Sequence, residues 1–365
     1  MRLAYDHQIF SLQRVGGISR YYVELAARLS TDSEFETAIV APFHMNALLA
    51  ERRQVTVVGA RVPHLRGTGA LRFALNAWIS RRYLRRNTPD IVHETYFSDG
   101  SVAPPGVRTV VTVFDMIHEL YPNFYHAGDP TARRKRAAVQ RASQVICISE
   151  STRHDLLEYI AVDPERVSVV PLAASSSFSQ ADARARSVSM PYVLYVGHRD
   201  GYKNFKRAVG AFVESGLPAM GIAFVCFGGG AWSAADAEVV SGAGVSSSLV
   251  IRRHGDDAAL AELYRNAEAF VYPSLYEGFG IPPLEAMACG CPVVSSNSSS
   301  LPEVVGEAAE LFDPIDVHDM ARALAAVVGK SDRSGELRDL GVRRAALFSW
   351  SKNAADTKAI YRRSV

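Results

Sequence analysis

The segment that decides the fold is AFVYPSLYEGFGIPPLEAMACGCPVVSSN, residues 269–297. It opens and closes with short apolar runs, and a glycine-rich turn containing Gly278 and Gly280 lies between them. The Pro-Pro step after the turn fits the first turn of a helix, where a missing N–H group costs little, and Gly290 suits the position just after a helix end. The segment therefore predicts a strand, a glycine loop, a helix and a second strand, as in a parallel βαβ unit.

The same alternation of apolar runs and helical segments extends through most of the chain. The runs are rich in β-branched residues and apolar on both faces, which is typical of strands buried in a parallel sheet. The pattern predicts two doubly wound, Rossmann-like α/β domains that face a central cleft, with ligands bound at the carboxyl ends of the strands. The predicted strands cover residues 2–6, 36–42, 55–59, 90–95, 108–115, 144–149 and 166–171 in the first half, and 191–197, 221–230, 247–255, 269–274, 292–297 and 309–314 in the second.

A small, polar segment without periodicity, residues 173–190, separates the two series of strands and predicts a linker. A chain of 365 residues is also long enough for two cores. The last segment has helical character and follows a serine that can cap a helix. The predicted divisions are a first domain at 1–175, a linker at 176–190, a second domain at 191–347 and a C-terminal helix at 348–365.

Composition and charge exclude several classes of protein. Hydrophobic residues make up 48% and charged residues 21%, as in a soluble globular protein, and a net charge of +2 gives no global field for nucleic acid. The amino terminus lacks the apolar core of a signal peptide, and no apolar run is long enough to span a bilayer. We therefore expect a cytoplasmic protein with free, buried thiols, since the cysteines lack the spacing of a zinc site; they are Cys147, Cys226, Cys289 and Cys291.

The glycine loop before the predicted helix has the character of an anion site. Backbone N–H groups point outward at a helix N-terminus, and Gly278 and Gly280 let a ligand approach the backbone closely. A phosphate-bearing ligand is expected, so the two carboxylates must serve another purpose. Glu277 on the loop would accept hydrogen bonds from the hydroxyls of a transferred sugar, and Glu285, in the first helical turn, from those of a ribose. The alternative is a pair of solvated glutamates, one of which stabilises the helix start.

Two other loops carry candidate residues. GHRDGYKNF follows a predicted strand and holds Arg199 and Lys203, which can neutralise a diphosphate, the arginine through bidentate contacts and the lysine as a point charge. RVGGIS places Gly16 and Gly17 directly before the first long helix. The alternatives are a solvated loop for the first segment and an ordinary tight turn for the second.

Blocks along essentially the whole chain resemble family 4 retaining glycosyltransferases. PSLYEGFGIPPLEAMACGCPVVSSNSSSLPEV is similar to the donor-site signature of that family, with its E-x7-E pair of glutamates. Further similar blocks, in family order, are GGISRYYVELAARL, DIVHETYF, VVTVFDMIHELYP, VICISESTRHDLLE, VSVVPLA, YVGHRDGYKNF and LAELYRNAEAFVYPS. The resemblance implies the GT-B architecture, with the acceptor in the N-terminal half, the nucleotide sugar mainly in the C-terminal half, and a final helix that crosses back to the N-terminal domain.

The resemblance also implies roles for residues that bind the donor. Gly16 and Gly17 would contact its diphosphate or sugar. Arg199 and Lys203 would stabilise the leaving diphosphate, although this arginine comes one position later than in the commonest form of the family. The remaining donor contacts are expected at Arg252, His254, Tyr276, Gly278, Phe279, Gly280, Ile281 and Glu285.

One family position is changed in this sequence. Many relatives have a histidine that meets the donor sugar where this chain has Phe114, so Asp115 and His118 are the expected substitutes for polar contacts to sugar or acceptor. A helix-capping Asp115 and a structural His118 are the alternatives. Glu94 and Tyr96, at another strand end, are expected on the acceptor side.

The expected mechanism needs positive charge around the departing diphosphate. The chain contains no D-x-D triplet of the kind that holds a metal ion in transferases of the other major fold. Helix N-termini with Arg199 and Lys203 can supply the charge, so no metal or other cofactor is expected. The resemblance implies retention of anomeric configuration, with front-face attack, and Glu277 would then orient the sugar rather than form a covalent intermediate.

The donor and acceptor follow only from the resemblance. YDHQIF, GGISRYY and DMIHELYP look most like bacterial mannosyltransferases, which implies mannose transfer from GDP-mannose to a saccharide or polyprenyl-diphosphate-linked acceptor in surface polysaccharide synthesis. A UDP- or dTDP-sugar donor is the first alternative. An epimerase or phosphorylase of the same fold and a non-catalytic carbohydrate-binding relative are the others.

Two basic segments lie in the expected acceptor half. Residues 65–87 combine arginines with Leu, Phe, Trp and Tyr, and residues 133–136 read RRKR. They would hold an anionic membrane, as a peripheral contact, or a lipid-linked diphosphate. A solvated helix face is the alternative.

Overall fold

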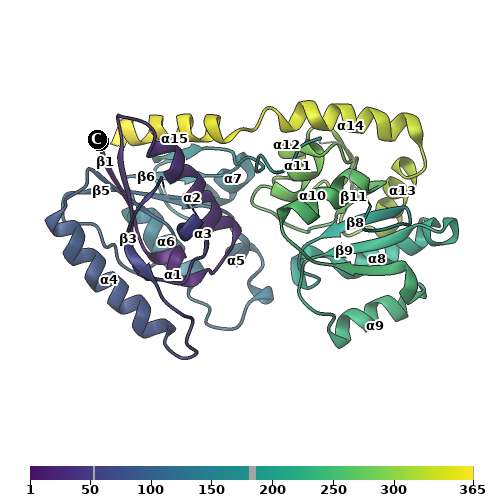
Figure 1. Ribbon diagram of the computed structural model, residues 1–365, viewed down its shortest axis with the longest axis horizontal. Coiled ribbons are helices and arrows are strands. Elements are labelled where there is room, and N and C mark those ends of the chain that lie inside the picture. The colour runs from purple at the N-terminus through teal and green to yellow at the C-terminus, as the bar shows by residue number, and fades with distance from the viewer. Residues whose placement is uncertain (52–53, 181–185, 365) are drawn as a thin grey trace. The chain divides into compact units, whose positions relative to one another are not determined.

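The computed structural model of the protein describes residues 1–51, 54–180 and 186–364 (Figure 1). The chain forms two compact units. The first comprises Met1–Leu172 and Trp350–Val365, and the second comprises Ala173–Ser349. Each unit has one parallel β-sheet with helices packed against it.

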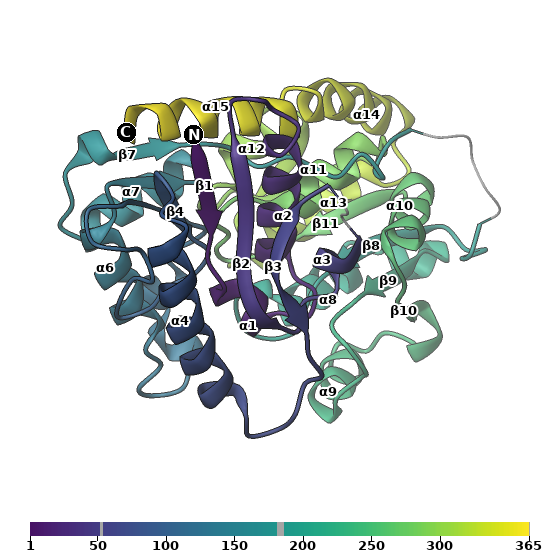
Figure 2. The ribbon, with the colours of Figure 1, turned by 60° about the vertical axis from the view of Figure 1, so that its left-hand side comes forward.

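The first unit has a seven-stranded parallel sheet of order β3-β2-β1-β4-β5-β6-β7. The chain builds outward from β1 to one edge and then returns to build the other, so the sheet is doubly wound, with its topological switch between β1 and β4. Figure 2 shows β1, β2 and β3 side by side. Each predicted strand of this half is confirmed: β1 Arg2–Tyr5, β2 Glu36–His44, β3 Thr56–Arg61, β4 Ile91–Glu94, β5 Arg108–Val113, β6 Gln144–Cys147 and β7 Val167–Val169.

The second unit repeats this plan with a six-stranded parallel sheet of order β10-β9-β8-β11-β12-β13. Its switch point lies between β8 and β11, and both faces of its central strands are buried. The strands agree with the predicted set: β8 Tyr192–Val196, β9 Ala223–Phe227, β10 Val250–Arg253, β11 Ala269–Tyr272, β12 Val293–Ser296 and β13 Ala309–Phe312.

Helices connect most of the successive strands in both units, and several begin at a side-chain cap. Asp256 caps α10 by accepting a hydrogen bond from Ala259 N, and Ser149 caps α7 in the same way through Thr152 N. The first unit contains α1 Gln8–Leu12, α2 Gly17–Leu29, α3 Leu48–Glu51, α4 Gly69–Arg86, α5 Ile117–Leu120, α6 Thr131–Arg141, α7 Glu150–Tyr159 and α15 Trp350–Ser364. The second contains α8 Phe205–Glu214, α9 Ala234–Gly242, α10 Asp257–Asn266, α11 Ile281–Ala288, α12 Leu301–Val305, α13 Val317–Val327 and α14 Ser331–Ala345.

The segment predicted as a linker, 176–190, packs in its described part against the second unit; residues 181–185 lie outside the described residues. Phe178 and Val188 are buried in the core on one face of the second sheet. Ser187 is held by hydrogen bonds to the carboxylate of Glu262. Because the segment is mostly polar, its composition did not indicate that Phe178 and Val188 are buried in the core.

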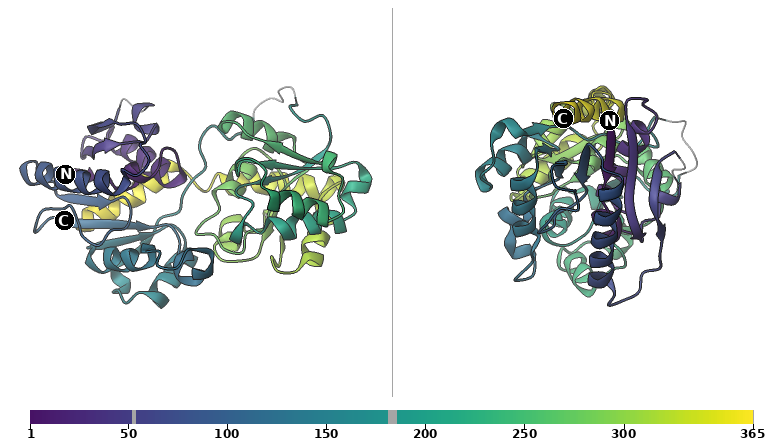
Figure 3. Two further views of the ribbon diagram at one scale, coloured as in Figure 1. Left: turned by 90° about the horizontal axis from the view of Figure 1, so that it is seen from below. Right: turned by 90° about the vertical axis from the view of Figure 1, so that its left-hand side faces the viewer.

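The C-terminal helix α15 belongs to the first unit, where it packs on α2 (Figure 3). Its Tyr361 hydroxyl lies in the buried core, 2.6 Å from Nδ1 of His93 and 3.2 Å from the hydroxyl of Tyr5. Nε2 of His93 lies 2.9 Å from Oγ1 of Thr112. A chain of buried polar contacts therefore connects α15 to three strands of the sheet.

The free energy of unfolding should fall as the medium becomes acidic, because His93 is buried as a neutral group. Burial lowers the pKa of His93 to about 3, against about 6.5 in an unfolded chain. The unfolded chain therefore binds the extra proton between these values, and stability present at pH 7 is lost below about pH 6.5. Between pH 7 and pH 5 this residue should account for a loss of about 2 kcal/mol.

Urea unfolding at the two pH values tests this dependence. His93→Gln should lose this part of the pH dependence, whereas the same change at the exposed His64 should retain it. An unchanged difference between pH 7 and pH 5 in His93→Gln would show that another group is responsible.

The four cysteines are free and buried, as predicted. In the part of the chain that the structure describes, no helix is long and apolar enough to cross a membrane.

Candidate functional site

The glycine loop of the second unit connects β11 to α11 at the carboxyl edge of the sheet. Gly280 adopts φ +112° immediately before the helix, a conformation that side chains rarely adopt, and a Cβ atom there would lie 2.8 Å from Leu301 Cδ2. The prolines occupy the first turn of α11, and Gly290 follows its end with φ +72°, as predicted. The positive end of the helix dipole therefore lies directly beside the loop.

Three consecutive serines after β12 hold this loop in place. Ser298 Oγ donates to the carbonyl of Leu275 at 2.7 Å, and Ser300 Oγ lies 2.8 Å from the carbonyl of Glu277. The Glu277 N–H donates to Ser299 Oγ at 2.9 Å. No role was expected for these serines, although a run of serines directly after a predicted strand is a signal that could have identified them.

Glu277 and Lys203 form the central contact of the site. Lys203 Nζ lies 2.6 Å from Glu277 Oε1 and 3.2 Å from the Tyr272 hydroxyl. The lysine side chain is 15% exposed and the glutamate 13%, so both are largely shielded yet reachable by a ligand. The pKa of Tyr272 is raised well above its usual value, first by burial and then by the Glu277 charge, so the phenol remains a neutral hydrogen-bonding group.

Arg199 lies on the same loop as Lys203 but turns toward the opposite neighbouring strand. Its guanidinium donates to carbonyls of the glycine-rich loop after β9, including Gly228 at 2.9 Å and Gly229 at 3.0 Å. Nε lies 3.2 Å from the Asp236 carboxylate, and the arginine side chain is only 3% exposed. The Arg199 guanidinium therefore binds the protein backbone in this structure. This differs from the expectation from the sequence, in which it makes a bidentate contact with a diphosphate.

The other predicted donor residues of this unit lie at the end of β10 and in the glycine loop itself. Arg252 donates a hydrogen bond to the carbonyl of Gly230, in the same glycine-rich loop that Arg199 binds. His254 is exposed in the loop after β10. Two glycines belong to the loop itself, Gly278 within it and Gly280 at its end.

Side chains on and after the loop are more buried than the sequence suggested. Phe279 is buried and packs edge-to-face on Phe348 with ring centroids 5.7 Å apart, so only its backbone can meet a ligand. Tyr276 is also buried, and Ile281 is partly exposed at the helix start. Glu285 is the fifth residue of α11 and so lies in the second turn; its expected place in the first turn was wrong because the helix begins at Ile281.

In the first unit, Gly16 and Gly17 form the start of α2, as predicted. Gly16 is the N-cap residue with extended backbone, and Gly17 is the first helical residue. A Cβ atom on Gly16 would overlap the side chain of Gln13, whose Oε1 accepts a hydrogen bond from Ser19 N. The absence of a side chain here therefore keeps the helix start compact.

The two residues expected on the acceptor side have different surroundings. Glu94 is fully buried and forms a bidentate ion pair with Arg141, so its carboxylate faces the protein interior rather than an acceptor. Burial raises the pKa of Glu94, and the Arg141 charge opposes that shift. Tyr96 lines a cavity of about 410 Å³ together with Leu12 and Phe73.

Asp115 and His118 lie at the start of the short helix α5. Asp115 Oδ1 accepts a hydrogen bond from Ile117 N at 3.2 Å, but the N-cap residue of α5 is Met116, so Asp115 supports the turn before the helix rather than capping it. The His118 ring stacks on Tyr125 with centroids 3.8 Å apart. Burial, followed by the charge of Lys135, lowers the pKa of His118, so the imidazole is neutral at neutral pH.

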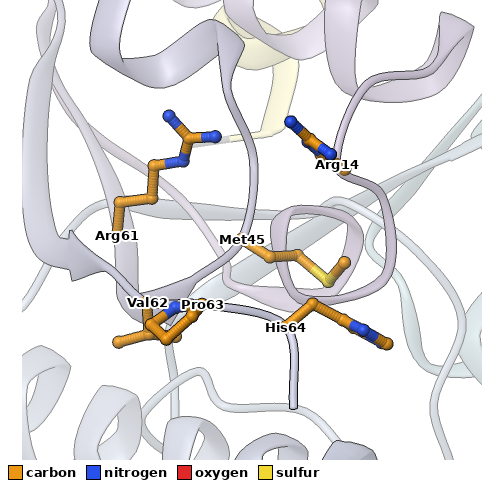
Figure 4. A pocket seen from close by; sticks show the side chains of 6 residues that line it. All are labelled: Arg14, Met45, Arg61, Val62, Pro63 and His64. Carbon is orange, nitrogen blue, oxygen red and sulfur yellow. The ribbon is translucent and has the colours of Figure 1, made fainter. Parts of the chain in front are cut away.

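The first unit also contains a cationic pocket of about 410 Å³ (Figure 4). Figure 4 shows the guanidinium groups of Arg14 and Arg61 on one side of it, with Val62, Pro63 and His64 on the opposite side. Both arginines are exposed, and neither has an ion pair with a carboxylate among the residues that the structure describes. Such a pocket suits an anionic group.

Comparison with known proteins gives the same assignment for both halves of the chain. Residues 15–175 match the family model "Glycosyltransferase Family 4", and residues 180–341 match "Glycosyl transferases group 1". The chain is 31% identical over 296 residues to the serotype-specific mannosyltransferase WbdA of Escherichia coli, covering 73% of this chain and 36% of that protein. It is 28% identical to the O-antigen chain mannosyltransferase B of Escherichia coli, over 95% of this chain and 96% of that one.

The chain thus spans only about a third of the length of WbdA. Among solved structures, the sucrose-phosphate synthase of Thermosynechococcus elongatus superposes with a TM-score of 0.79 at 21% identity, over 99% of this chain and 98% of that one, which concerns the fold alone. The two family matches, the relatives and the two parallel sheets all indicate the same family and fold. The chain belongs to the family 4 glycosyltransferases and has their GT-B fold, with two Rossmann-like units.

Proposed function

We propose that the protein transfers a hexose from a nucleotide sugar, with retention of anomeric configuration, to a saccharide or lipid-linked saccharide during bacterial surface polysaccharide synthesis. The observation that carries this proposal is the Glu277–Lys203 contact of 2.6 Å beside the start of α11. A carboxylate, a cation and a helix N-terminus lie together at the carboxyl edge of the second sheet, and the carboxylate is able to accept hydrogen bonds from sugar hydroxyls. These are the groups needed to bind a sugar diphosphate.

The reaction separates positive charge at the anomeric carbon from negative charge on the departing diphosphate. Lys203 and the N-terminus of α11 are the groups that would stabilise the diphosphate as it leaves. Glu277 would hold the hydroxyls of the transferred sugar, and Glu285 those of the ribose. Because these groups supply the positive charge, we propose that transfer needs no metal ion or other cofactor.

GDP-mannose is the proposed donor, which is supported by the relatives named as mannosyltransferases. A UDP- or dTDP-sugar remains the alternative within the same reaction. An epimerase, a phosphorylase or a non-catalytic binding protein of the same fold is the alternative outside it, and the Lys203–Glu277 pair argues against a silent site.

Thermal unfolding with nucleotides tests the donor assignment. GDP should raise the midpoint of unfolding by about 5 °C at a concentration near 100 times its dissociation constant, because a ligand stabilises only the state that binds it. UDP, dTDP and ADP, at equal concentration, should raise it less. A larger shift with UDP would mean that the donor carries uracil instead of guanine, and the proposed transferase reaction would still stand. No shift with any nucleotide would contradict the proposed donor site.

The proposed acceptor is a saccharide, free or linked to a polyprenyl diphosphate. The cationic pocket at Arg14 and Arg61 supports the second form, since two guanidinium groups match a diphosphate in charge and geometry. A lipid-linked acceptor would place the protein at the cytoplasmic face of the membrane as a peripheral protein.

A further inference from the structure

Helix α4 of the first unit exposes several of its large apolar side chains, although it also buries Leu84 in the core. Asn76 and Ser80 are fully buried, whereas Leu71 is 64% exposed, Leu75 41% and Trp78 63%. A helix that packs only on its own protein normally buries its apolar side. We call the stripe formed by Leu71, Leu75, Trp78, Arg82 and Arg85 the α4 outer face; these residues lie three or four positions apart and share one side of the helix.

Hydrogen bonds attach the polar side of α4 to the rest of the unit. The Asn76 amide donates to Ser11 Oγ at 2.9 Å and to the Phe43 carbonyl at 3.0 Å, and it accepts from the Phe43 N–H at 2.8 Å. The helix contacts β2 and α1 and lies at the periphery of the first unit (Figure 1). Asn76 and the buried Leu84 thus anchor the inner side of α4, whereas Leu71, Leu75 and Trp78 remain exposed on its other side, where they can contact a partner outside the chain.

The positive charge of α4 indicates which kind of partner its outer face would bind. The sequence from residue 52 to residue 89 contains no aspartate or glutamate, and α4 alone carries five arginines. Arg82, Arg85 and Arg86 are exposed, and no carboxylate pairs with them among the described parts of the chain. The outer face is apolar in its first half and basic in its second, which fits an apolar layer bordered by negative charge.

We propose that the α4 outer face binds the surface of an anionic lipid bilayer. Leu71, Leu75 and Trp78 would enter the boundary between headgroups and acyl chains, and Arg82 and Arg85 would contact anionic headgroups. The helix would lie in the plane of the surface rather than across it, because Arg72 near its start and the four arginines near its end leave no apolar stretch long enough to cross. The proposal uses only α4, so it is independent of the donor site of the second unit.

Vesicle co-sedimentation tests the proposal with two variants and their matched controls. Vesicles with about 30% anionic lipid should bind the protein at low salt and release most of it at high salt, because screening weakens the arginine contacts. Leu71→Ser/Leu75→Ser/Trp78→Ser should lower the partition coefficient by about tenfold or more. Met220→Ser/Ile315→Ser/Leu347→Ser removes three similarly exposed apolar side chains from the second unit and should leave binding unchanged.

A charge variant separates the two parts of the face. Arg82→Glu/Arg85→Glu should weaken binding to anionic vesicles by about tenfold or more, whereas Lys206→Glu/Arg343→Glu, two exposed cations of the second unit, should not. Trp78 fluorescence gives a local readout, because the other two tryptophans are more buried. Brominated lipid should quench it in the wild-type protein, and this quenching should be absent in Trp78→Phe.

Several results would overturn the proposal. Equal vesicle binding by the wild-type protein and the serine variant would place the membrane contact elsewhere on the protein. Failure of the wild-type protein to bind vesicles at low salt would rule out the proposed membrane contact. A dimer seen by light scattering that the serine variant abolishes, without vesicle binding, would assign the face to a second copy of the chain. Vesicle binding is measured without a nucleotide sugar, so these failures leave the proposed transferase reaction standing.

Discussion

Replacing Glu277 by alanine is expected to abolish sugar transfer while nucleotide binding largely survives. Its carboxylate is the proposed acceptor for the hydroxyls of the transferred sugar, and its backbone is fixed by Ser299 and Ser300. Removing a positioned group that acts mainly in the transition state lowers turnover by about 10² to 10³ or more. Glu277→Gln keeps the size of the side chain and removes the charge, so it should show an intermediate loss.

Turnover and GDP affinity should be measured on the same preparations, together with the midpoint of thermal unfolding. Glu310 is the matched control, because its side chain is 17% exposed and also forms ion pairs, with Arg322 and Arg333 on the surface of the second unit. Glu310→Gln should change stability only. Near-normal turnover in Glu277→Ala would remove this residue from the reaction, and equal losses of turnover and nucleotide affinity would assign it to nucleotide binding.

Lys203 and Arg199 are expected to respond to substitution in opposite ways, although the family resemblance implied the same role for both. Lys203→Met removes a cation that a diphosphate can reach, so turnover should fall by about 10²-fold or more with a small change in stability. Arg199→Met leaves several backbone carbonyls without their donor and Asp236 without its ion pair. Breaking a buried ion pair costs about 3 kcal/mol or more, so this variant should lose mainly stability.

Urea unfolding and turnover, measured on both variants, separate these effects. Combining Lys203→Met with Glu277→Gln shows whether the lysine acts only by holding the glutamate, in which case the second substitution adds nothing further. If Arg199→Met retained its stability but lost nucleotide affinity, the guanidinium would contact the diphosphate after all. If Lys203→Met retained its turnover, the leaving group would be stabilised by other groups.

The sequence predicted the strands and the local shape of the donor loop because each rests on short-range patterns. Apolar runs on both faces require parallel strands, and the Gly-X-Gly-X-Pro-Pro order requires a turn followed by a helix start. The position of Glu285 was wrong by one turn because a helix boundary depends on backbone geometry at Gly280.

Partners that are distant in the sequence could not be predicted. Nothing local indicates that Arg199 meets a loop about thirty residues later, or that Glu94 is neutralised by Arg141. The burial of Phe279 likewise depends on Phe348, which comes from another part of the chain. The composition of α4 suggested a basic, apolar segment, but the burial of Asn76, Ser80 and Leu84 was needed to show which of its sides faces outward.

The stereochemistry of transfer is the most direct test of the proposed reaction. The purified protein should be incubated with GDP-mannose and a lipid-linked saccharide fraction, and the one-bond carbon–proton coupling at the anomeric centre of the product measured by NMR. We expect a product with the α configuration of the donor, and no product when Glu277 is replaced by alanine. A β-linked product, or full transfer by the Glu277→Ala variant, would contradict the proposed reaction.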